Sequence, residues 1–238
     1  MKPALKTFQK KVLKILSGKI DDFYLSGGTA LSLYYFQHRD SQDLDFFTRE
    51  FSRARIQEVV TLLSKELRKK PALIAEESRK NMAKVAVYSL HIRKDEYMKV
   101  DFVQDWLGFI KEPRLINGIK VLSISDIYIR KIYAIVGTFQ VKDSIGRKAA
   151  SGGRQEAKDL YDLYCLSNTY MKLSVFAYRY CQQTTREGII RWFRTYDRFY
   201  MKTGLLELGL KKNVDYTDIE LHFKKEVDKM LQKEIEFI

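Results

Sequence analysis

The stretch that decides the fold runs from Leu25 to Phe47 and reads LSGGTALSLYYFQHRDSQDLDFF. Its apolar start stops at Gly27 and Gly28, which predicts a short strand followed by a tight turn. A helix is expected directly after the turn, over Thr29–Phe36. Glycines let backbone N–H groups approach a ligand, and the start of a helix favours an anion. The turn is therefore a candidate phosphate site, although a strand–Gly-Gly–helix pattern is more often only a tight turn.

The acidic residues of this stretch, Asp43 and Asp45, lie two positions apart on a second expected strand, Asp43–Phe47. Residues two apart on a strand point to the same face, so the two carboxylates lie side by side while Leu44 and Phe46 can enter the core. Neighbouring carboxylates repel each other unless a cation joins them, and Mg²⁺ prefers oxygen ligands. A solvated pair is the alternative, but Asp is a poor strand former. The pattern therefore predicts a Mg²⁺ site.

A third acidic residue, Asp101, lies inside the apolar segment Lys99–Val103, which reads KVDFV. If that strand neighbours the one carrying Asp43 and Asp45, the three carboxylates can hold two Mg²⁺ for in-line phosphoryl chemistry. One ion would bind a triphosphate, and the other would lower the pKa of an acceptor hydroxyl. The three residues are thus the candidate metal ligands.

The composition is that of a folded protein with a basic surface. Of the 238 residues, 45% are hydrophobic and 31% are charged, which is enough to bury a core. Forty-three Lys and Arg residues against 30 Asp and Glu leave a net charge of +13. Such an excess indicates a polyanionic partner, with nucleic acid as the first candidate. Solvated Lys-rich helices explain the charge equally well.

Several classes of protein are excluded by the same composition. Cys165 and Cys181 are too few for a disulfide framework, and with three histidines they leave no plausible zinc site. No apolar run approaches the roughly 18 residues of a membrane helix. The segment Met1–Lys19 has apolar residues at helical spacing with lysines between them, which predicts an amphipathic helix and not an export signal. We therefore expect a cytoplasmic protein with no membrane partner.

The two halves of the chain differ in their patterns. Expected strands and helices alternate in the first half, which includes a β-hairpin over residues 82–103. Ser123 and Asp126 then form a capping-box pattern that starts a run of helices, interrupted by an expected loop over Gly137–Arg154. We expect an α+β fold in two domains, an α/β domain over 1–122 and a helical domain over 123–238.

One of the expected helices, Glu187–Lys202, carries a stripe of basic residues. They recur at positions i, i+3, i+7 and i+11, which places them on one face of a helix. Guanidinium groups suit phosphates, and aromatic residues between them suit unstacked bases. A packed helix with its aromatic residues in the core is the alternative. The candidate RNA-binding residues are Arg191, Arg194, Arg198 and Lys202.

The order of these motifs resembles that of a known fold. A Gly-Gly turn, a helix, D-x-D on the next strand and a further strand Asp are similar to the DNA polymerase β-type nucleotidyltransferases. More narrowly, GGTAL, HRDSQDLDFF and KDLYDLY resemble the AbiEii/AbiGii-type nucleotidyltransferase toxins, over about Phe23 to Leu166. The resemblance implies an N-terminal nucleotidyltransferase domain with a mixed sheet flanked by helices, followed by a C-terminal helical bundle.

The resemblance also implies roles for individual residues. It implies metal binding by the three strand aspartates, Asp43, Asp45 and Asp101. It implies NTP binding by a turn, its polar lead-in and a helix lysine, namely Gly27, Gly28, Thr29, Arg39, Ser41 and Lys131. It implies a catalytic set of Asp43, Asp45, Asp101, Lys131 and Asp159.

Two of these residues have plain structural alternatives. Lys131 follows Arg130 on a helix of a Lys-rich protein and can be a solvated lysine. Asp159 shares its helix face with Asp162, and the two can be helix-end charges paired with Arg154 or Lys158. Between the two acids we favour Asp159 for catalysis.

The activity implied by the resemblance is Mg²⁺-dependent transfer of a nucleoside monophosphate from an NTP to an acceptor hydroxyl, with release of pyrophosphate. The implied acceptor is RNA, with the tRNA 3′ end as the first candidate. The implied setting is the toxin of a toxin–antitoxin or phage-defence system, with a cognate antitoxin as a partner. The alternatives are transfer to a protein or small-molecule hydroxyl, and a non-catalytic module that binds RNA or protein.

Overall fold

The computed structural model describes residues 3–78, 83–93, 95–137, 139–142, 146 and 148–236. The chain divides into two compact units. The first unit comprises Met1–Tyr35 and Asp40–Asp126, and the second comprises Phe36–Arg39 and Ile127–Ile238. The predicted domain boundary lies after residue 122, whereas these units divide between Asp126 and Ile127, within a helix, and the short segment Phe36–Arg39 packs with the second unit.

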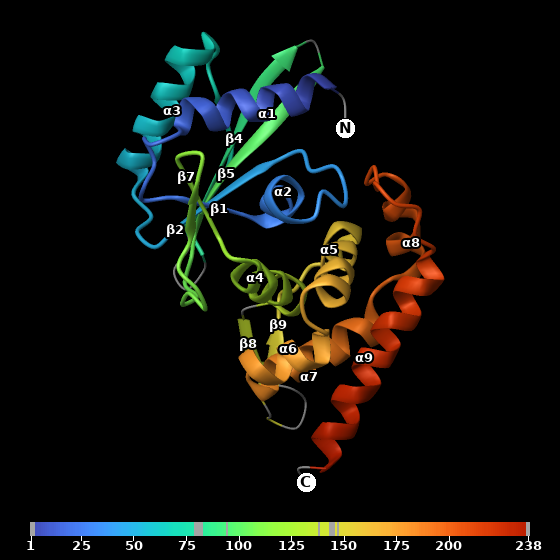
Figure 1. The fold of residues 1–238 in the computed structure, drawn as a ribbon. Helices are drawn as coiled ribbons and strands as arrows, with labels where there is room; N and C mark the ends of the chain where they lie inside the picture. Colours follow the sequence, from blue (N-terminus) through green and yellow to red (C-terminus); the bar gives the residue numbers. More distant parts are fainter. Residues whose placement is uncertain are drawn as a thin grey trace. The chain divides into compact units, whose positions relative to one another are not determined.

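The first unit is built on a mixed sheet, as predicted (Figure 1). The strand order is β3-β4-β5-β2-β1-β7-β6. β1 runs parallel to β7 and β2 runs parallel to β5, whereas the other neighbours are antiparallel. The strands are β1 (Tyr24–Ser26), β2 (Leu44–Thr48), β3 (Ala72–Glu77), β4 (Val85–Arg93), β5 (Glu96–Gln104), β6 (Arg114–Ile116) and β7 (Ile119–Val121).

Helices of the first unit follow the patterns read from the sequence. The amphipathic N-terminal segment forms α1 (Pro3–Leu16), and α1 packs against α3 (Arg53–Leu67) (Figure 1). The side chain of Ser52 caps the start of α3 by accepting a hydrogen bond from the backbone N–H of Arg55. The helix expected after the Gly-Gly turn is one α-helical turn, α2 (Gly27–Ala30), that continues as the π-helix η1 (Leu31–Tyr35).

The capping box predicted at Ser123 is confirmed at the start of α4 (Ile124–Val136). The Ser123 hydroxyl accepts a hydrogen bond from the Asp126 backbone N–H at 3.2 Å and donates one to the Asp126 carboxylate at 2.6 Å. Asn117-Gly118, a pair typical of tight turns between strands, joins β6 to β7, with both residues at positive φ.

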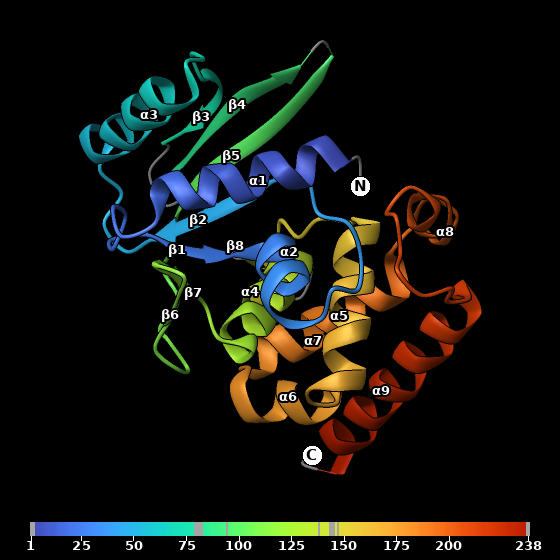
Figure 2. The same ribbon diagram turned by 45° about the horizontal axis from the view of Figure 1, so that its top comes forward.

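The second unit contains α5 (Ala157–Thr169), α6 (Leu173–Tyr180), α7 (Gln183–Thr195), α8 (Arg198–Leu206) and α9 (Tyr216–Glu236). In Figure 2, α9 runs beside α6 and α7. Fully buried side chains such as Phe176, Phe223 and Met230 fill the core of this unit. The C-terminal region is helical, as predicted, apart from one hairpin. None of the helices that the structure describes is long and apolar enough to cross a membrane.

That hairpin corrects the loop predicted over Gly137–Arg154. Within the described residues, this segment forms β8 (Phe139–Lys142) paired with β9 (Lys148–Ser151). A Cβ atom at Gly137 would lie 1.9 Å from the Ser151 carbonyl oxygen, and one at Gly153 would lie 2.0 Å from the Ile135 carbonyl oxygen. The glycines that suggested a loop instead allow backbones to pack closely at the base of the hairpin.

The helix predicted over Glu187–Lys202 is also wrong, because it is two helices. Tyr196 has an extended backbone, with φ −67° and ψ 147°, and ends α7. The Asp197 side chain then accepts a hydrogen bond from the Tyr200 backbone N–H at 2.9 Å and starts α8. An Asp that caps a new helix interrupts the basic stripe, which therefore does not form one helix face.

Candidate active site

The centre of the candidate site is a row of three residues on neighbouring strands of the first unit. Ser26 at the end of β1 is paired in register with Asp45 on β2, and Asp45 is paired with Asp101 on β5. Partners in register on parallel strands project to the same face of a sheet, so the carboxylates of Asp45 and Asp101 lie side by side. The strands β2 and β5 are therefore neighbours in the sheet, as predicted.

The burial pattern of β2 follows the alternation predicted from its sequence. Leu44 and Phe46 are completely buried, whereas Asp45 between them is half-buried. Asp43, which precedes the strand, and Asp101 are half-buried as well. The strand therefore turns its apolar side chains into the core and leaves its acidic side chains partly open to solvent.

Gly27 fits this site for two reasons. Its φ of +70° is a left-handed conformation that an L side chain rarely adopts. A Cβ atom at this position would lie 2.0 Å from Oδ2 of Asp45 and 2.8 Å from its Cγ. The Asp45 carboxylate thus occupies the space where a side chain at position 27 would be, and the glycine turn lies against an acidic residue of the sheet.

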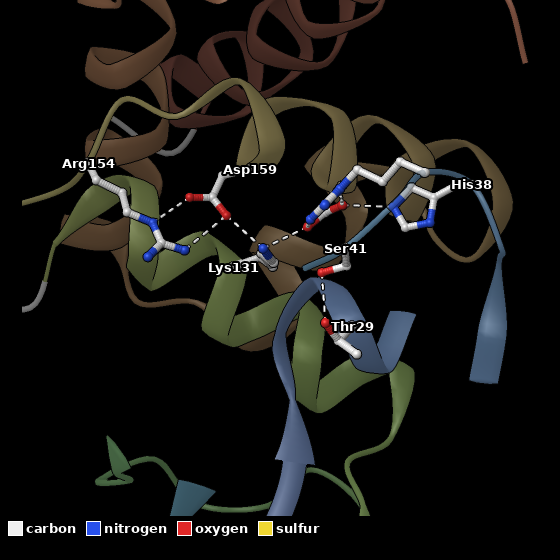
Figure 3. Close-up of polar contacts among 8 residues, drawn as sticks. Thr29, His38, Ser41, Lys131, Arg154 and Asp159 are labelled. Atoms are coloured by element: carbon white, nitrogen blue, oxygen red, sulfur yellow. Dashed lines mark hydrogen bonds and ion pairs between the residues drawn. The ribbon is translucent and has the colours of Figure 1, made fainter. Parts of the chain in front are cut away.

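The hydroxyl of Thr29 contacts the segment that leads into β2. Thr29 is 1% exposed, and its Oγ1 donates a hydrogen bond to the backbone carbonyl of Asp43. The same Oγ1 lies 2.7 Å from Oγ of Ser41 (Figure 3). On the other side of this segment, the Gln9 amide of α1 donates a hydrogen bond of 2.8 Å to the Ser41 carbonyl. The predicted NTP-binding residues Thr29 and Ser41 are thus bonded to each other.

The strand acids suit a hard divalent cation only in part. Among the described residues, no group of three or more His, Cys, Asp or Glu side chains is arranged to hold a metal ion. Mg²⁺, however, is usually held by one or two carboxylates together with substrate phosphates and water, and not by a complete protein cage. The adjacent carboxylates of Asp45 and Asp101, with Asp43 two residues before Asp45, match that smaller requirement.

A second acidic cluster lies within the second unit. Asp159 and Asp162 on α5 are both completely buried, and the Lys131 ammonium from α4 lies between them, 2.7 Å from Asp159 Oδ1 and 2.6 Å from Asp162 Oδ2. The guanidinium of Arg154 also binds Asp159 (Figure 3). The pairing of the Asp159 carboxylate with Arg154, one of the structural alternatives read from the sequence, is therefore present.

Asp162 is held from the other side by the short segment Phe36–Arg39. Arg39 donates two hydrogen bonds to it, from Nε at 2.7 Å and from Nη2 at 2.8 Å. Nε2 of His38 lies 2.7 Å from Oδ1 of the same carboxylate. Arg39 and His38 are themselves buried, and the Lys211 backbone N–H binds the His38 carbonyl. These bonds to Asp162 and to the Lys211 backbone explain why the segment belongs to the second unit.

The electrostatics of this second cluster keep its members charged. Burial alone would raise the pKa of Asp162, but Arg39 and Lys131 outweigh it and hold that pKa well below its usual range. The pKa of Asp159 is likewise lowered, because Lys131 and Arg154 overcome the effect of burial. Burial opposes the charge on Lys131, yet the two carboxylates raise its pKa. The cluster is therefore an ion network in which two buried carboxylates are paired with three cationic side chains.

Sequence reasoning missed parts of both clusters. The sequence patterns assign no role to His38, which contacts the Asp162 carboxylate, or to Gln9, which binds the Ser41 carbonyl. The available signal for Gln9 was a polar residue on an otherwise apolar helix face. Lys131, Arg39 and Ser41 are placed in the bonds described above, and whether they also bind an NTP stays a prediction.

The candidate RNA-binding residues are all exposed but lie on two helices. Arg191 on α7 donates a hydrogen bond to the Ala150 carbonyl at 3.1 Å. Arg198 on α8 forms an ion pair of 2.7 Å with Glu220 and lies over the rings of Phe193 and Tyr196. Part of the charge expected to face RNA is therefore used inside the second unit.

Comparison with protein families assigns the chain. The family described as nucleotidyl transferase AbiEii toxin, of type IV toxin–antitoxin systems, matches residues 11–238. The chain belongs to the AbiEii nucleotidyl transferase toxin family. The family match extends through α9, well beyond the motifs that suggested it, so both units of this AbiEii family member are covered.

Two solved structures share the fold of this AbiEii family member. JHP933 from Helicobacter pylori is 16% identical, with a TM-score of 0.55 over 100% of this chain and 97% of its own. A candidate nucleotidyltransferase from H. pylori is 18% identical, with a TM-score of 0.56 over 100% and 99% of the two chains. At these identities the likeness concerns the fold. Comparison with curated proteins found no match.

Proposed function

We propose that this chain is a Mg²⁺-dependent nucleotidyltransferase that moves a nucleoside monophosphate from an NTP to a hydroxyl of RNA. The observation that carries the proposal is the register of Ser26, Asp45 and Asp101 on three adjacent strands, with the Gly27 turn against Asp45. A glycine turn beside a pair of carboxylates combines a candidate phosphate site with a candidate metal site. Membership of a nucleotidyl transferase family supports the same chemistry.

In this proposal, Asp43, Asp45 and Asp101 hold the metal. Mg²⁺ bound there would neutralise phosphate oxygens and lower the pKa of the acceptor hydroxyl. The acceptor oxygen bonds to the α-phosphorus and releases its proton to solvent. The bond from the α-phosphorus to the bridging oxygen of the β-phosphate breaks, and pyrophosphate leaves. The backbone N–H groups at Gly27 and Gly28 orient the triphosphate for this in-line displacement.

In this proposal, the buried network of Lys131, Asp159 and Asp162 has a structural role and not a catalytic one. Each carboxylate already accepts bonds from two or more cationic groups at about 3 Å or less. Such groups hold a protein segment in a defined position more readily than they exchange protons with a substrate. We therefore assign catalysis to the strand acids of the first unit, and we assign Asp159 and Lys131 a structural role within the second unit.

RNA is the proposed acceptor, with the 3′ end of tRNA as the first candidate. The net charge of +13 and the exposed cations on α7 and α8 favour a polyanionic partner. Membership of a type IV toxin–antitoxin family supports a toxic activity and a cognate antitoxin. Because NTPs and RNA are abundant in the cytoplasm, a cytoplasmic location is part of the same proposal.

The test is transfer of label from α-³²P-NTPs by the purified chain. Each of the four NTPs is offered with total tRNA, with a protein extract and with a small-molecule acceptor pool, in Mg²⁺ or in EDTA. The proposal expects label in RNA, only with Mg²⁺, and lost after treatment with a ribonuclease. Label in protein or in a small molecule would support the transfer reaction but show that RNA is not the acceptor. Absence of label in every fraction would contradict a transferase and favour a binding module.

A further inference from the structure

The Thr29 hydroxyl is fully engaged within the protein. It has one proton, and the Asp43 carbonyl can only accept, so the Thr29 proton is donated to Asp43. The contact of 2.7 Å with Ser41 must then run the other way, with the Ser41 hydroxyl donating to the Thr29 oxygen. At 1% exposure, Thr29 has no further donor to offer a ligand.

Two buried side chains thus tie down the three residues before β2. Gln9 is completely buried and holds the Ser41 carbonyl, while Thr29 holds the Asp43 carbonyl. Asp43 directly precedes Leu44, the first residue of β2. Fixing the Asp43 carbonyl fixes the peptide plane from which the strand starts, and therefore the direction of the Asp43 side chain.

We propose that Thr29 is a positioning residue for the metal-binding acids and not a ligand of the triphosphate. This inference rests on the proposed function, because it gives Thr29 a task at the same metal site. The hydroxyl acts through the Asp43 backbone and holds the Asp43 and Asp45 carboxylates at the separation at which both reach one cation. A second hydroxyl residue at this position, serine, would serve equally well.

The chain offers a matched control in Thr48. Thr48 ends β2, is 2% exposed, and donates a hydrogen bond of 3.2 Å to the Glu50 carbonyl. It therefore has the same residue type, burial and kind of bond as Thr29, although Thr29 lies on α2 and Thr48 on β2. It lies at the end of β2 away from Asp43, and it has no part in the proposed site.

The experiment measures Mn²⁺ binding without nucleotide by electron paramagnetic resonance, as a readout independent of catalysis. Thr29→Val should weaken Mn²⁺ binding on the order of fivefold, which is the effect of losing the one hydrogen bond that holds the Asp43 carbonyl. Thr29→Ser and Thr48→Val should stay near wild type, and Thr29→Cys, a weaker donor, should fall between. In transfer assays, Thr29→Val should raise the Mg²⁺ requirement but leave the KM for NTP at saturating Mg²⁺ unchanged.

Three results would overturn the inference. The first is a raised KM for NTP in Thr29→Val with unchanged Mn²⁺ binding, which would make Thr29 a phosphate ligand. The second is any sign that the substitution causes only structural damage. That sign would be an equal loss of Mn²⁺ binding in Thr29→Val and Thr48→Val, or a Thr29→Val chain that fails to fold while Thr29→Cys binds Mn²⁺ like wild type. The third is a wild-type chain that binds no Mn²⁺, which would overturn the proposed function as well, whereas the first two leave it intact.

Discussion

The two acidic clusters of this protein use the same residue type for opposite purposes. Asp45 and Asp101 lie side by side on the sheet of the first unit and are half-buried. Asp159 and Asp162 on α5 of the second unit are completely buried. The second pair is surrounded by Lys131 and by the guanidinium groups of Arg39 and Arg154.

The difference shows what an acidic pair needs in order to bind a metal. A carboxylate whose lone pairs accept bonds from fixed cations has no capacity for Mg²⁺, and removing its partner leaves a buried charge. A carboxylate that remains partly open to solvent can exchange water for a metal ion and substrate phosphates. We therefore expect substitutions in the first cluster to change activity, and substitutions in the second to change stability.

The largest effect is expected for Asp45→Asn. The substitution keeps the volume of the side chain and removes a metal-binding charge beside Asp101, so the fold should be retained. Transfer should fall by about 10³-fold, equivalent to about 4 kcal/mol of barrier. Label transfer and thermal melting of the same preparation measure the two quantities. Near-wild-type transfer would show that the metal site lies elsewhere.

Asp162→Asn should mainly lower the stability of the fold, in contrast to Asp45→Asn, which should mainly lower transfer. Loss of this buried charge leaves Arg39 and Lys131 without their shared anion, which should lower the free energy of unfolding by about 3–5 kcal/mol. The control is Glu58→Gln, which breaks an exposed pair with Arg55 and should change it by less than about 1 kcal/mol. Urea denaturation measures both, and equal small losses would contradict the structural role of Asp162.

Gly27→Ala tests whether the turn and the acid depend on each other. Gly18 has nearly the same positive φ, +69° against +70°, but a Cβ atom there meets nothing within 4 Å. Both substitutions should cost about 1–2 kcal/mol of stability from backbone strain. Only Gly27→Ala should also displace Asp45 and abolish transfer. Activity retained in Gly27→Ala would mean that the Asp45 carboxylate can move without loss.

The smallest effect is expected in how the melting temperature falls at acidic pH. The pKa of Asp159 is lowered in the folded protein. Its ion pairs therefore stabilise the fold above the unfolded pKa of about 3.9, and this stabilisation is lost as the pH falls through the lower, folded pKa. From pH 5 to pH 2.5 the melting temperature of wild type should fall more steeply than that of Asp159→Asn. Parallel curves would mean that Asp159 titrates alike in both states.

Much of the fold was predictable because its signals are local. The alternation in DLDFF, the capping box at Ser123 and the Asn117-Gly118 turn each depend on neighbouring residues, and all three are present. The errors arose where tertiary contacts decide. β3 was missed because both its faces are mostly exposed and it lacks apolar alternation. The glycines of the β8–β9 hairpin were taken for flexibility, although they serve close backbone packing.

The candidate site was predictable in its residue types but not in its partners. Asp43, Asp45 and Asp101 could be proposed from their positions in apolar strands, and the register of β2 and β5 brings the last two together. Nothing local in the sequence joins Lys131 to Asp162 or Arg39 to the same carboxylate. Such pairs form between residues up to 123 positions apart, so they depend on the packing of whole helices.

The central claim is that Asp45 binds the catalytic metal, and a metal-specificity switch tests it most directly. Transfer is measured for Asp45→Cys and Asp45→Asn with Mg²⁺, Mn²⁺ and Cd²⁺. A thiolate is a poor ligand for Mg²⁺ but a good one for softer ions. We predict that Asp45→Cys is inactive with Mg²⁺ and regains transfer with Cd²⁺, with Mn²⁺ giving less recovery than Cd²⁺, whereas Asp45→Asn stays inactive with all three. Full activity of Asp45→Cys with Mg²⁺, or equal inactivity of both variants with every metal, would contradict the claim.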